Sequence, residues 1–82
     1  MNQLYAKFLY PDYGMEADRI RVRELGLEVG KMYKVRDVEI GGWYTDIWLE
    51  GYKGSFNSVH FEFYEDGEEI DIYEDPRYNP YI

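Results

Sequence analysis

Residues 31–64, KMYKVRDVEIGGWYTDIWLEGYKGSFNSVHFEFY, contain the longest run of alternating apolar side chains in this sequence of 82 residues. The alternation predicts three strands of an antiparallel meander. The first strand spans residues 31–40, the second spans residues 43–50, and the third follows residues 51–58. The Gly41-Gly42 pair between the first two strands predicts a two-residue hairpin turn, because both central positions of that turn need positive φ angles.

The phase of the alternation predicts which side chains of each strand face the core. In the first strand the apolar phase changes between Val35 and Val38, which predicts a β-bulge near Arg36 and Asp37. The expected core positions of the second and third strands are Trp43, Thr45, Ile47, Leu49, Val59, Phe61 and Phe63. The opposite face is expected to carry Tyr44, Asp46, Trp48, Glu50, His60, Glu62 and Tyr64.

Shorter elements flank the meander. Residues 3–10 alternate as a first strand, and residues 70–73 form a last strand after a tight turn at residues 65–68. Residues 15–25 favour a short helix with acids at its start, arginines at its end and Gly26 as a left-handed cap. A strand is the alternative for residues 15–25, with Ile20 and Val22 pointing inward.

Composition indicates one domain over residues 1–82, with residues 74–82 as an extended C-terminal tail that is either frayed or laid across the core by its tyrosines. The sequence has no cysteine, which excludes disulfides, thiolate metal sites and a cysteine nucleophile. It has no long apolar run, so we expect a cytoplasmic protein that does not enter a membrane.

The net charge of −8 is unevenly distributed. Residues 1–36 contain seven basic and five acidic side chains, whereas residues 37–75 contain twelve acidic side chains and Lys53 as their one basic side chain. The second region therefore carries −11. Such a surface repels the phosphates of long nucleic acids and attracts a basic partner.

Three segments resemble a known group of proteins: LEVGKMYKV (residues 27–35), GGWYTDIWLEGYKG (residues 41–54) and SFNSVHFEFYED (residues 55–66). The pattern is similar to that of small proteins encoded by phages, prophages and mobile elements of Gram-positive bacteria. The resemblance implies a Src-homology-3-like β-barrel, and most members of the group have no assigned activity. Together with the strand pattern, it leads us to expect a mainly β, small antiparallel barrel of about five strands with one short helix.

No catalytic residue, cofactor or metal site is predicted. His60, the only histidine, is expected on the surface beside Glu62, and Ser58 is the only hydroxyl near it on the same face. Asn57 and Ser58 are expected to cap a turn. No further residue completes a triad, so we expect a protein that is not an enzyme.

The acidic run of residues 65–75 has three interpretations. Its spacing does not match an EF-hand calcium loop, which disfavours a metal site. It can form a solvated edge strand whose charges prevent pairing with other chains. It can also bind a basic protein, and the acids proposed for that surface are Glu65, Asp66, Glu68, Glu69 and Asp71.

Large aromatic side chains are expected on the outer face of the meander: Tyr44, Trp48 and Tyr64, with Tyr52 nearby. Either the helix or the tail covers them, or they contact a partner, because Trp and Tyr dominate interface hot spots. A small-ligand alternative is a nucleotide that stacks on Trp48, with its phosphates held by Arg19, Arg21, Arg23 or Lys31.

These observations favour a non-enzymatic phage accessory protein, a monomer or small homo-oligomer, that binds a host protein through an acidic and aromatic surface. A surface of carboxylates can imitate DNA, so a defence or nucleic-acid-handling enzyme is the expected target. Sequestration of a nucleotide and a structural role in assembly are the alternatives.

Overall fold

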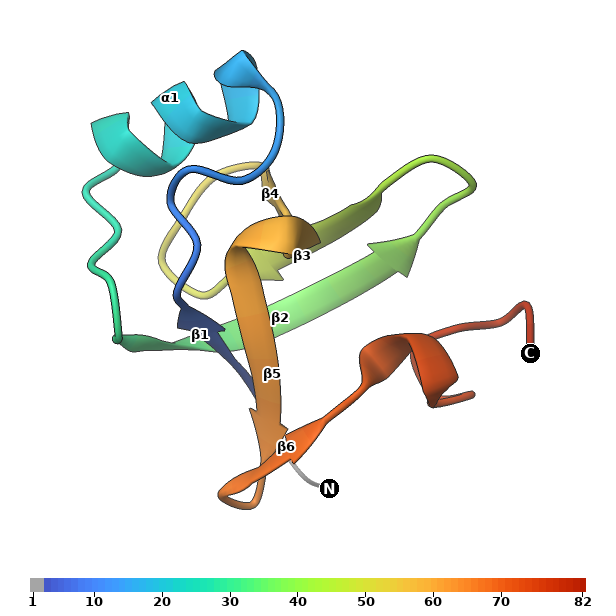
Figure 1. Cartoon of the computed structure of the whole chain (residues 1–82). Helices are drawn as coiled ribbons and strands as arrows, with labels where there is room; N and C mark the ends of the chain where they lie inside the picture. The colour runs from blue at the N-terminus through green and yellow to red at the C-terminus, as the bar shows by residue number, and fades with distance from the viewer. Residues whose placement is uncertain (1–2) are drawn as a thin grey trace.

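The computed structural model describes residues 3–82, which form six strands, one α-helix and two short 3₁₀ turns (Figure 1). The elements are β1 (Leu4–Phe8), α1 (Glu16–Glu24), β2 (Met32–Ile40), β3 (Thr45–Leu49), β4 (Ser55–Asn57), η1 (Ser58–His60), β5 (Phe61–Glu65), β6 (Glu68–Ile70) and η2 (Ile72–Glu74).

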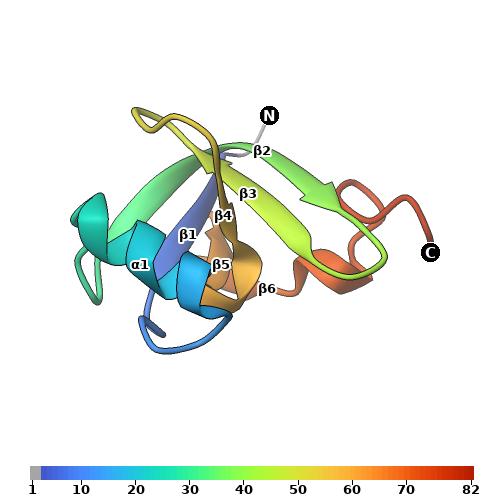
Figure 2. The ribbon, with the colours of Figure 1, turned by 90° about the horizontal axis from the view of Figure 1, so that it is seen from above.

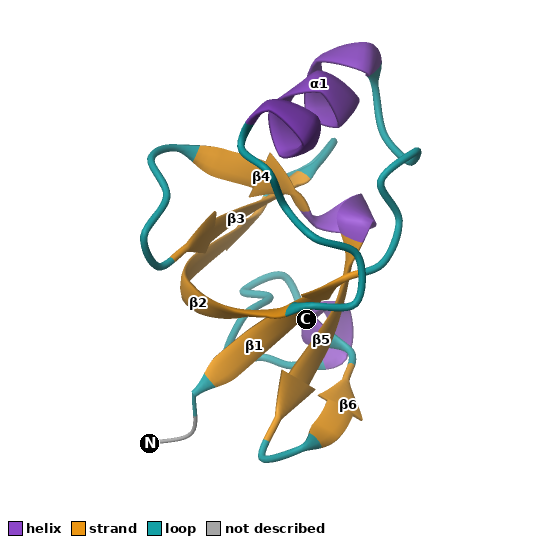
Figure 3. Cartoon of the chain, turned by 90° about the vertical axis from the view of Figure 1, so that its left-hand side faces the viewer, coloured by secondary structure: helices purple, strands orange, loops and turns teal. Residues whose placement is uncertain are grey.

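All six strands pair antiparallel in one curled sheet with the order β4-β3-β2-β1-β5-β6 (Figure 3). The mainly β class, the antiparallel arrangement and the short helix are confirmed. The sheet is not closed, because β4 and β6 remain its two edges, so the expected barrel is not confirmed. The additional strand is β4, which lies in the segment expected to be only a connection.

The concave face of the sheet carries the core. Buried side chains alternate along β1 and β3, and the chain continues the core with Phe56 on β4 and Ile72 in η2. The pairing of β2 with β3 shifts between Val35 and Asp37, which confirms the expected bulge. This bulge allows both Val35 and Ile40 to point inward although their spacing along the strand is odd.

Residues 16–24 form a helix, and the strand alternative is wrong. Gly26 has a φ angle of +71° and ends the helix in a Schellman motif. In this motif the N–H of Gly26 donates to the carbonyl of Arg23, and the N–H of Leu27 donates to that of Val22. Val22 is the buried residue of the helix, which packs on β4 (Figure 2).

The turn between β2 and β3 is longer than expected. Ile40 pairs with Thr45, and the N–H of Gly41 donates to the carbonyl of Tyr44, so residues 41–44 form a four-residue loop. Neither glycine of the loop has a positive φ angle. The expectation of a core position for Trp43 is wrong, because this side chain is 98% exposed on the loop.

The phase expected for the start of the third strand is also wrong. Val59 is 41% exposed, whereas His60 is fully buried. The cause is η1, a 3₁₀ turn capped by the Asn57 side chain, which accepts a hydrogen bond from the N–H of Val59. One turn of 3₁₀ helix changes the alternation of side chains, and the strand pattern begins again at Phe61.

The turn after β5 has the expected chemistry. Asp66 and Gly67 both have positive φ angles, 54° and 80°, and connect the paired residues Glu65 and Glu68 as a two-residue hairpin. The strand that follows is shorter than expected, because β6 ends at Ile70 and the chain turns into η2.

Candidate binding surface

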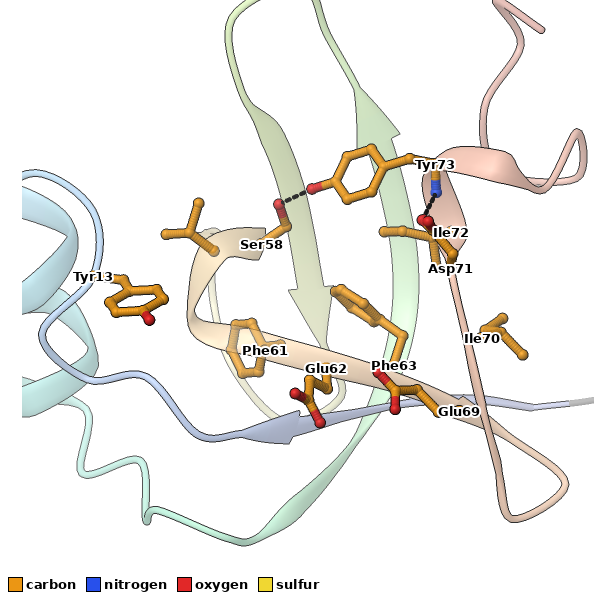
Figure 4. A pocket seen from close by; sticks show the side chains of 11 residues that line it. Tyr13, Ser58, Phe61, Glu62, Phe63, Glu69, Ile70, Asp71, Ile72 and Tyr73 are labelled. Carbon is orange, nitrogen blue, oxygen red and sulfur yellow. Dashed lines mark hydrogen bonds between the residues drawn. The ribbon is translucent and has the colours of Figure 1, made fainter.

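An open groove of about 650 Å³ lies where β6 separates from β5 (Figure 4). The last pair between the two strands is Phe63 with Ile70. Beyond this pair the chain departs into η2, and the neighbouring part of β5 is left without a strand on that side. The groove is lined by Tyr13, Ser58, Val59, Phe61, Glu62, Phe63, Glu69, Ile70, Asp71, Ile72 and Tyr73.

The floor of the groove is apolar and its rim is acidic. Phe61, Phe63 and Ile72 belong to the core and are buried. Val59, Tyr13 and Tyr73 form exposed apolar or aromatic walls. The charged side chains at the groove are Glu62, Glu69 and Asp71, and all three are acidic.

Two tyrosines hold the carboxylate of Glu62. The Tyr10 hydroxyl donates to Oε2 at 2.6 Å, and the Tyr64 hydroxyl donates to Oε1 at 3.3 Å. The hydrogen bond to Glu62 raises the pKa of Tyr10 from 10.0 to about 12. Tyr10 also stacks on Tyr13, with ring centroids 4.7 Å apart. The Tyr10 side chain therefore positions both Tyr13, which forms a wall of the groove, and Glu62, an acid at its rim.

The other side of the groove is held by a bond between η1 and η2. The hydroxyls of Ser58 and Tyr73 lie 2.5 Å apart (Figure 4). The Asp71 side chain caps η2 by accepting from the N–H of Tyr73 at 2.9 Å. These contacts position η2 relative to η1 independently of the strand pairing.

The acidic run divides into an inward and an outward part. Glu65 is buried and accepts from Arg77 Nη2 at 3.0 Å and from the Tyr78 hydroxyl at 3.1 Å. Burial, with this hydrogen bond to Glu65, raises the pKa of Tyr78. Arg77 also pairs with Asp75, and its hydrogen bond holds the pKa of Asp75 below the usual value. Glu65 therefore anchors the C-terminal segment.

The remaining acids proposed for the binding surface are exposed: Asp66, Glu68, Glu69 and Asp71. The C-terminal segment is anchored by Tyr78, as expected for one of its tyrosines, but it folds into turns rather than an extended strap. Its compactness comes in part from Asn79, whose side chain donates to the carbonyl of Tyr73 at 2.8 Å.

The outward aromatic side chains do not form one cluster. Trp48 lies on β3 and Tyr64 on β5, with β2 and β1 between them in the sheet. Tyr44 lies in the loop between β2 and β3 and is exposed. Tyr52 packs against the core through Tyr33.

The residues of the nucleotide alternative are not assembled around one cavity. Arg19 donates to the carbonyl of Gly14 at 2.6 Å. Arg21 donates to the main-chain carbonyls of Ser55, at the start of β4, and of Lys53, before it. Lys31 lies 3.6 Å from a carboxylate oxygen of Glu28. Arg23 is exposed on α1, while Trp48 lies on β3.

His60 and Ser58 lie in the same turn, η1, but have different hydrogen-bond partners. His60 is buried rather than on the surface, and its Nδ1 lies 2.7 Å from the carbonyl oxygen of Tyr10. Ser58 bonds instead to Tyr73. Within residues 3–82, no group of three or more histidine, aspartate or glutamate side chains is arranged to hold a metal ion.

The groove itself was not predicted from the sequence. The sequence pattern predicts a core position for Val59 and a strand position for Tyr73, and it gives no role to Tyr13. The available signal was Asn57-Ser58, a pair that favours capped turns. Such a turn before β5 exposes Val59.

A family model described as Bacteriophage T4 protein Y07B matches residues 3–82. The chain belongs to this family. Membership in the Y07B family supports the phage origin that the resemblance implied, although neither a Src-homology-3-like barrel nor a Gram-positive host follows from it. No curated protein and no solved structure matches the chain. In the part of this Y07B-family chain that the structure describes, no helix is long and apolar enough to cross a membrane.

Proposed function

We propose that this member of the Y07B family is a non-enzymatic phage accessory protein that occupies a basic surface of a host protein. The observation that carries the proposal is the exposed acidic edge formed by the β5–β6 hairpin and the start of η2. Its exposed acids are Asp66, Glu68, Glu69 and Asp71. A concentrated acidic edge speeds association with a basic partner and opposes association with nucleic acid.

The partner class follows from this charge. Host proteins that bind DNA or RNA present basic surfaces that neutralise phosphates. An acidic edge that covers such a surface competes with nucleic acid for it. A defence enzyme or another nucleic-acid-handling enzyme of the host is therefore the proposed target, and inhibition is the proposed result.

The test uses charge reversal on the acidic edge. Tagged wild-type protein is incubated with host lysate at low and moderate salt, the retained proteins are identified, and the binding of each is measured again with purified components. We expect the variant in which Glu68, Glu69 and Asp71 are replaced by lysine to lose binding, and we expect DNA to compete with the wild type. Screening by salt should weaken the wild-type complex.

A matched control reverses three exposed acids elsewhere, Asp12, Glu24 and Glu28, so that the net charge changes equally. This control should retain most of the binding. If the two triple variants bind equally well, the acidic edge is not the contact surface and the proposal fails.

A further inference from the structure

We propose that the groove between β5 and η2 binds an extended segment of the partner in which lysine or arginine side chains alternate with apolar ones. This inference rests on the proposed function, because the acids around the groove belong to the same edge. It adds the location of the contact and the chemistry of the bound segment.

The first argument is the apolar floor. The bottom of the groove is formed by Phe61, Phe63, Ile70 and Ile72, and Val59 adds an exposed wall. A volume of about 650 Å³ falls in the range of ordinary ligand sites, which is large enough for a few side chains. A purely cationic segment would leave this floor in contact with water, whereas alternating apolar side chains would bury it.

The second argument is the open main-chain edge of β5. Phe8 on β1 uses both of its main-chain groups on the side of β2: its N–H donates to the Lys31 carbonyl at 3.0 Å, and its carbonyl accepts from Gly30 at 2.7 Å. Phe61 is the β5 residue opposite Phe8, so its main-chain groups point away from β1. The N–H of Phe61 donates to the carbonyl of Ser58, so the Phe61 carbonyl is the group that this residue leaves for a partner on the side away from β1.

An extended peptide beside this edge continues the sheet where β6 stops. Strand addition of this kind obtains affinity from main-chain hydrogen bonds and specificity from alternate side chains. Successive side chains of an extended segment point in opposite directions, so one set reaches the floor while the other set lies along the rim.

The third argument is the charge of the rim. Glu62 lies on β5, Glu69 on β6 and Asp71 at the N-cap of η2, so carboxylates from two strands and from the turn after them line the groove (Figure 4). Glu62 is held in place by the hydroxyls of Tyr10 and Tyr64. A fixed carboxylate loses less conformational entropy when a cation binds, which favours lysine or arginine over a neutral side chain.

The experiment uses defined peptides and the whole protein. The probe is a fluorescein-labelled peptide of about seven residues in which lysine and valine alternate, which spans roughly 23 Å when extended. A peptide of equal length and charge, with serine in place of valine, is the control. Fluorescence anisotropy at moderate salt gives both affinities. We expect the lysine–valine peptide to bind about tenfold more tightly, a difference that simple charge attraction does not produce.

A substitution in the groove separates apolar docking from charge attraction. Val59→Glu adds a negative charge at an exposed wall, so simple charge attraction predicts tighter binding of a cationic peptide. Docking in the groove predicts weaker binding by about tenfold, because the apolar contact is lost. Val29→Glu is the matched control, since Val29 is also exposed but lies outside the groove, and it should change the affinity by less than about twofold.

Backbone amide shifts of the wild-type protein give a second measurement that does not depend on the folding of a variant. We expect the shifts caused by the lysine–valine peptide to centre on Val59, Phe61 and Asp71. Shifts confined to the Asp66-Gly67 turn, equal affinities for the two peptides, no binding of either peptide, or unchanged or tighter binding by V59E would overturn the inference. One result would separate the two proposals. If both peptides bind the wild type equally well and the lysine variant of the acidic edge binds neither peptide, the proposed function stands, but the inference that the groove is the docking site fails.

Discussion

Arg21 connects the helix to the sheet, and its replacement tests whether this arginine is structural or is available for a ligand. Its Nε donates to the carbonyl of Ser55 at 2.7 Å, and its Nη2 donates to the carbonyl of Lys53. The guanidinium carbon also lies 4.7 Å from the ring centroid of Phe56. Gly54 allows this approach, because a Cβ atom there would lie 2.9 Å from Arg21 Nη2.

The substitution Arg21→Met removes the guanidinium while retaining an unbranched side chain of similar helix propensity. Hydrogen bonds from a charged donor contribute about 1.5–3 kcal/mol each when well shielded, and stacking on an aromatic ring adds about 0.5–1 kcal/mol. Arg21 is half-buried, so each of its two hydrogen bonds should contribute no more than the lower end of the range for hydrogen bonds. We therefore expect R21M to lower the free energy of unfolding by about 2–3 kcal/mol.

The assay is urea unfolding followed by circular dichroism, with a thermal melt as a second measure. A loss of this size corresponds to a decrease in Tm of about 10–20 °C for a domain of this length. Arg23→Met is the control, because Arg23 is exposed on the same helix, and its effect should stay within about 0.5 kcal/mol. If R21M and R23M are equally stable, Arg21 does not hold the helix on β4, and a ligand role for it becomes the better interpretation.

Two other predictions concern the tyrosine and carboxylate contacts. The pKa of Tyr10 is raised from 10.0 to about 12, so the stabilisation from its bond to Glu62 is fully present below pH 10 and is lost as the pH rises through about 12. The unfolding free energies of wild type and Tyr10→Phe should therefore converge over that range, and a difference that persists unchanged above it would contradict the assigned bond. Glu65→Gln should lower the free energy of unfolding by about 1–2 kcal/mol and speed proteolysis of residues 75–82, because a charged acceptor for Arg77 is lost. Glu68→Gln, on the exposed side of the same hairpin, is the control and should change neither the free energy of unfolding nor the rate of proteolysis.

Features with a local cause could be predicted from the sequence. Gly26 follows a helix whose last turn carries arginines, and Asp66-Gly67 separates two strands, so each glycine supplies a positive φ angle that its turn requires. The bulge near Asp37 was predictable because burial of both Val35 and Ile40 on one face needs an extra residue. In each case the chemistry of a few adjacent residues determines the geometry.

The sequence did not predict features that depend on the exact number of residues in the connection between two strands. The expected hairpin at Gly41-Gly42 was too short by two residues, and this placed Trp43 in the core instead of in the loop. The capping role of Asn57 was expected, but its consequence for the alternation of side chains was not, so Val59 and His60 exchanged faces. A shift of one residue moves every following side chain to the other face of a strand.

The same limit applies to charge. Net charge says how many carboxylates a segment carries, whereas the strand register decides which of them reach the surface. Glu65 and Glu69 belong to one acidic run, yet Glu65 is buried against Arg77 while Glu69 lies exposed opposite Tyr64. The exposed part of the run lies beside the apolar groove, so in the complex that we propose its charge and the apolar floor would act on the same partner. Charge variants alone therefore cannot separate the two contributions, and a substitution such as V59E, which raises the negative charge while removing apolar contact, is needed to do so.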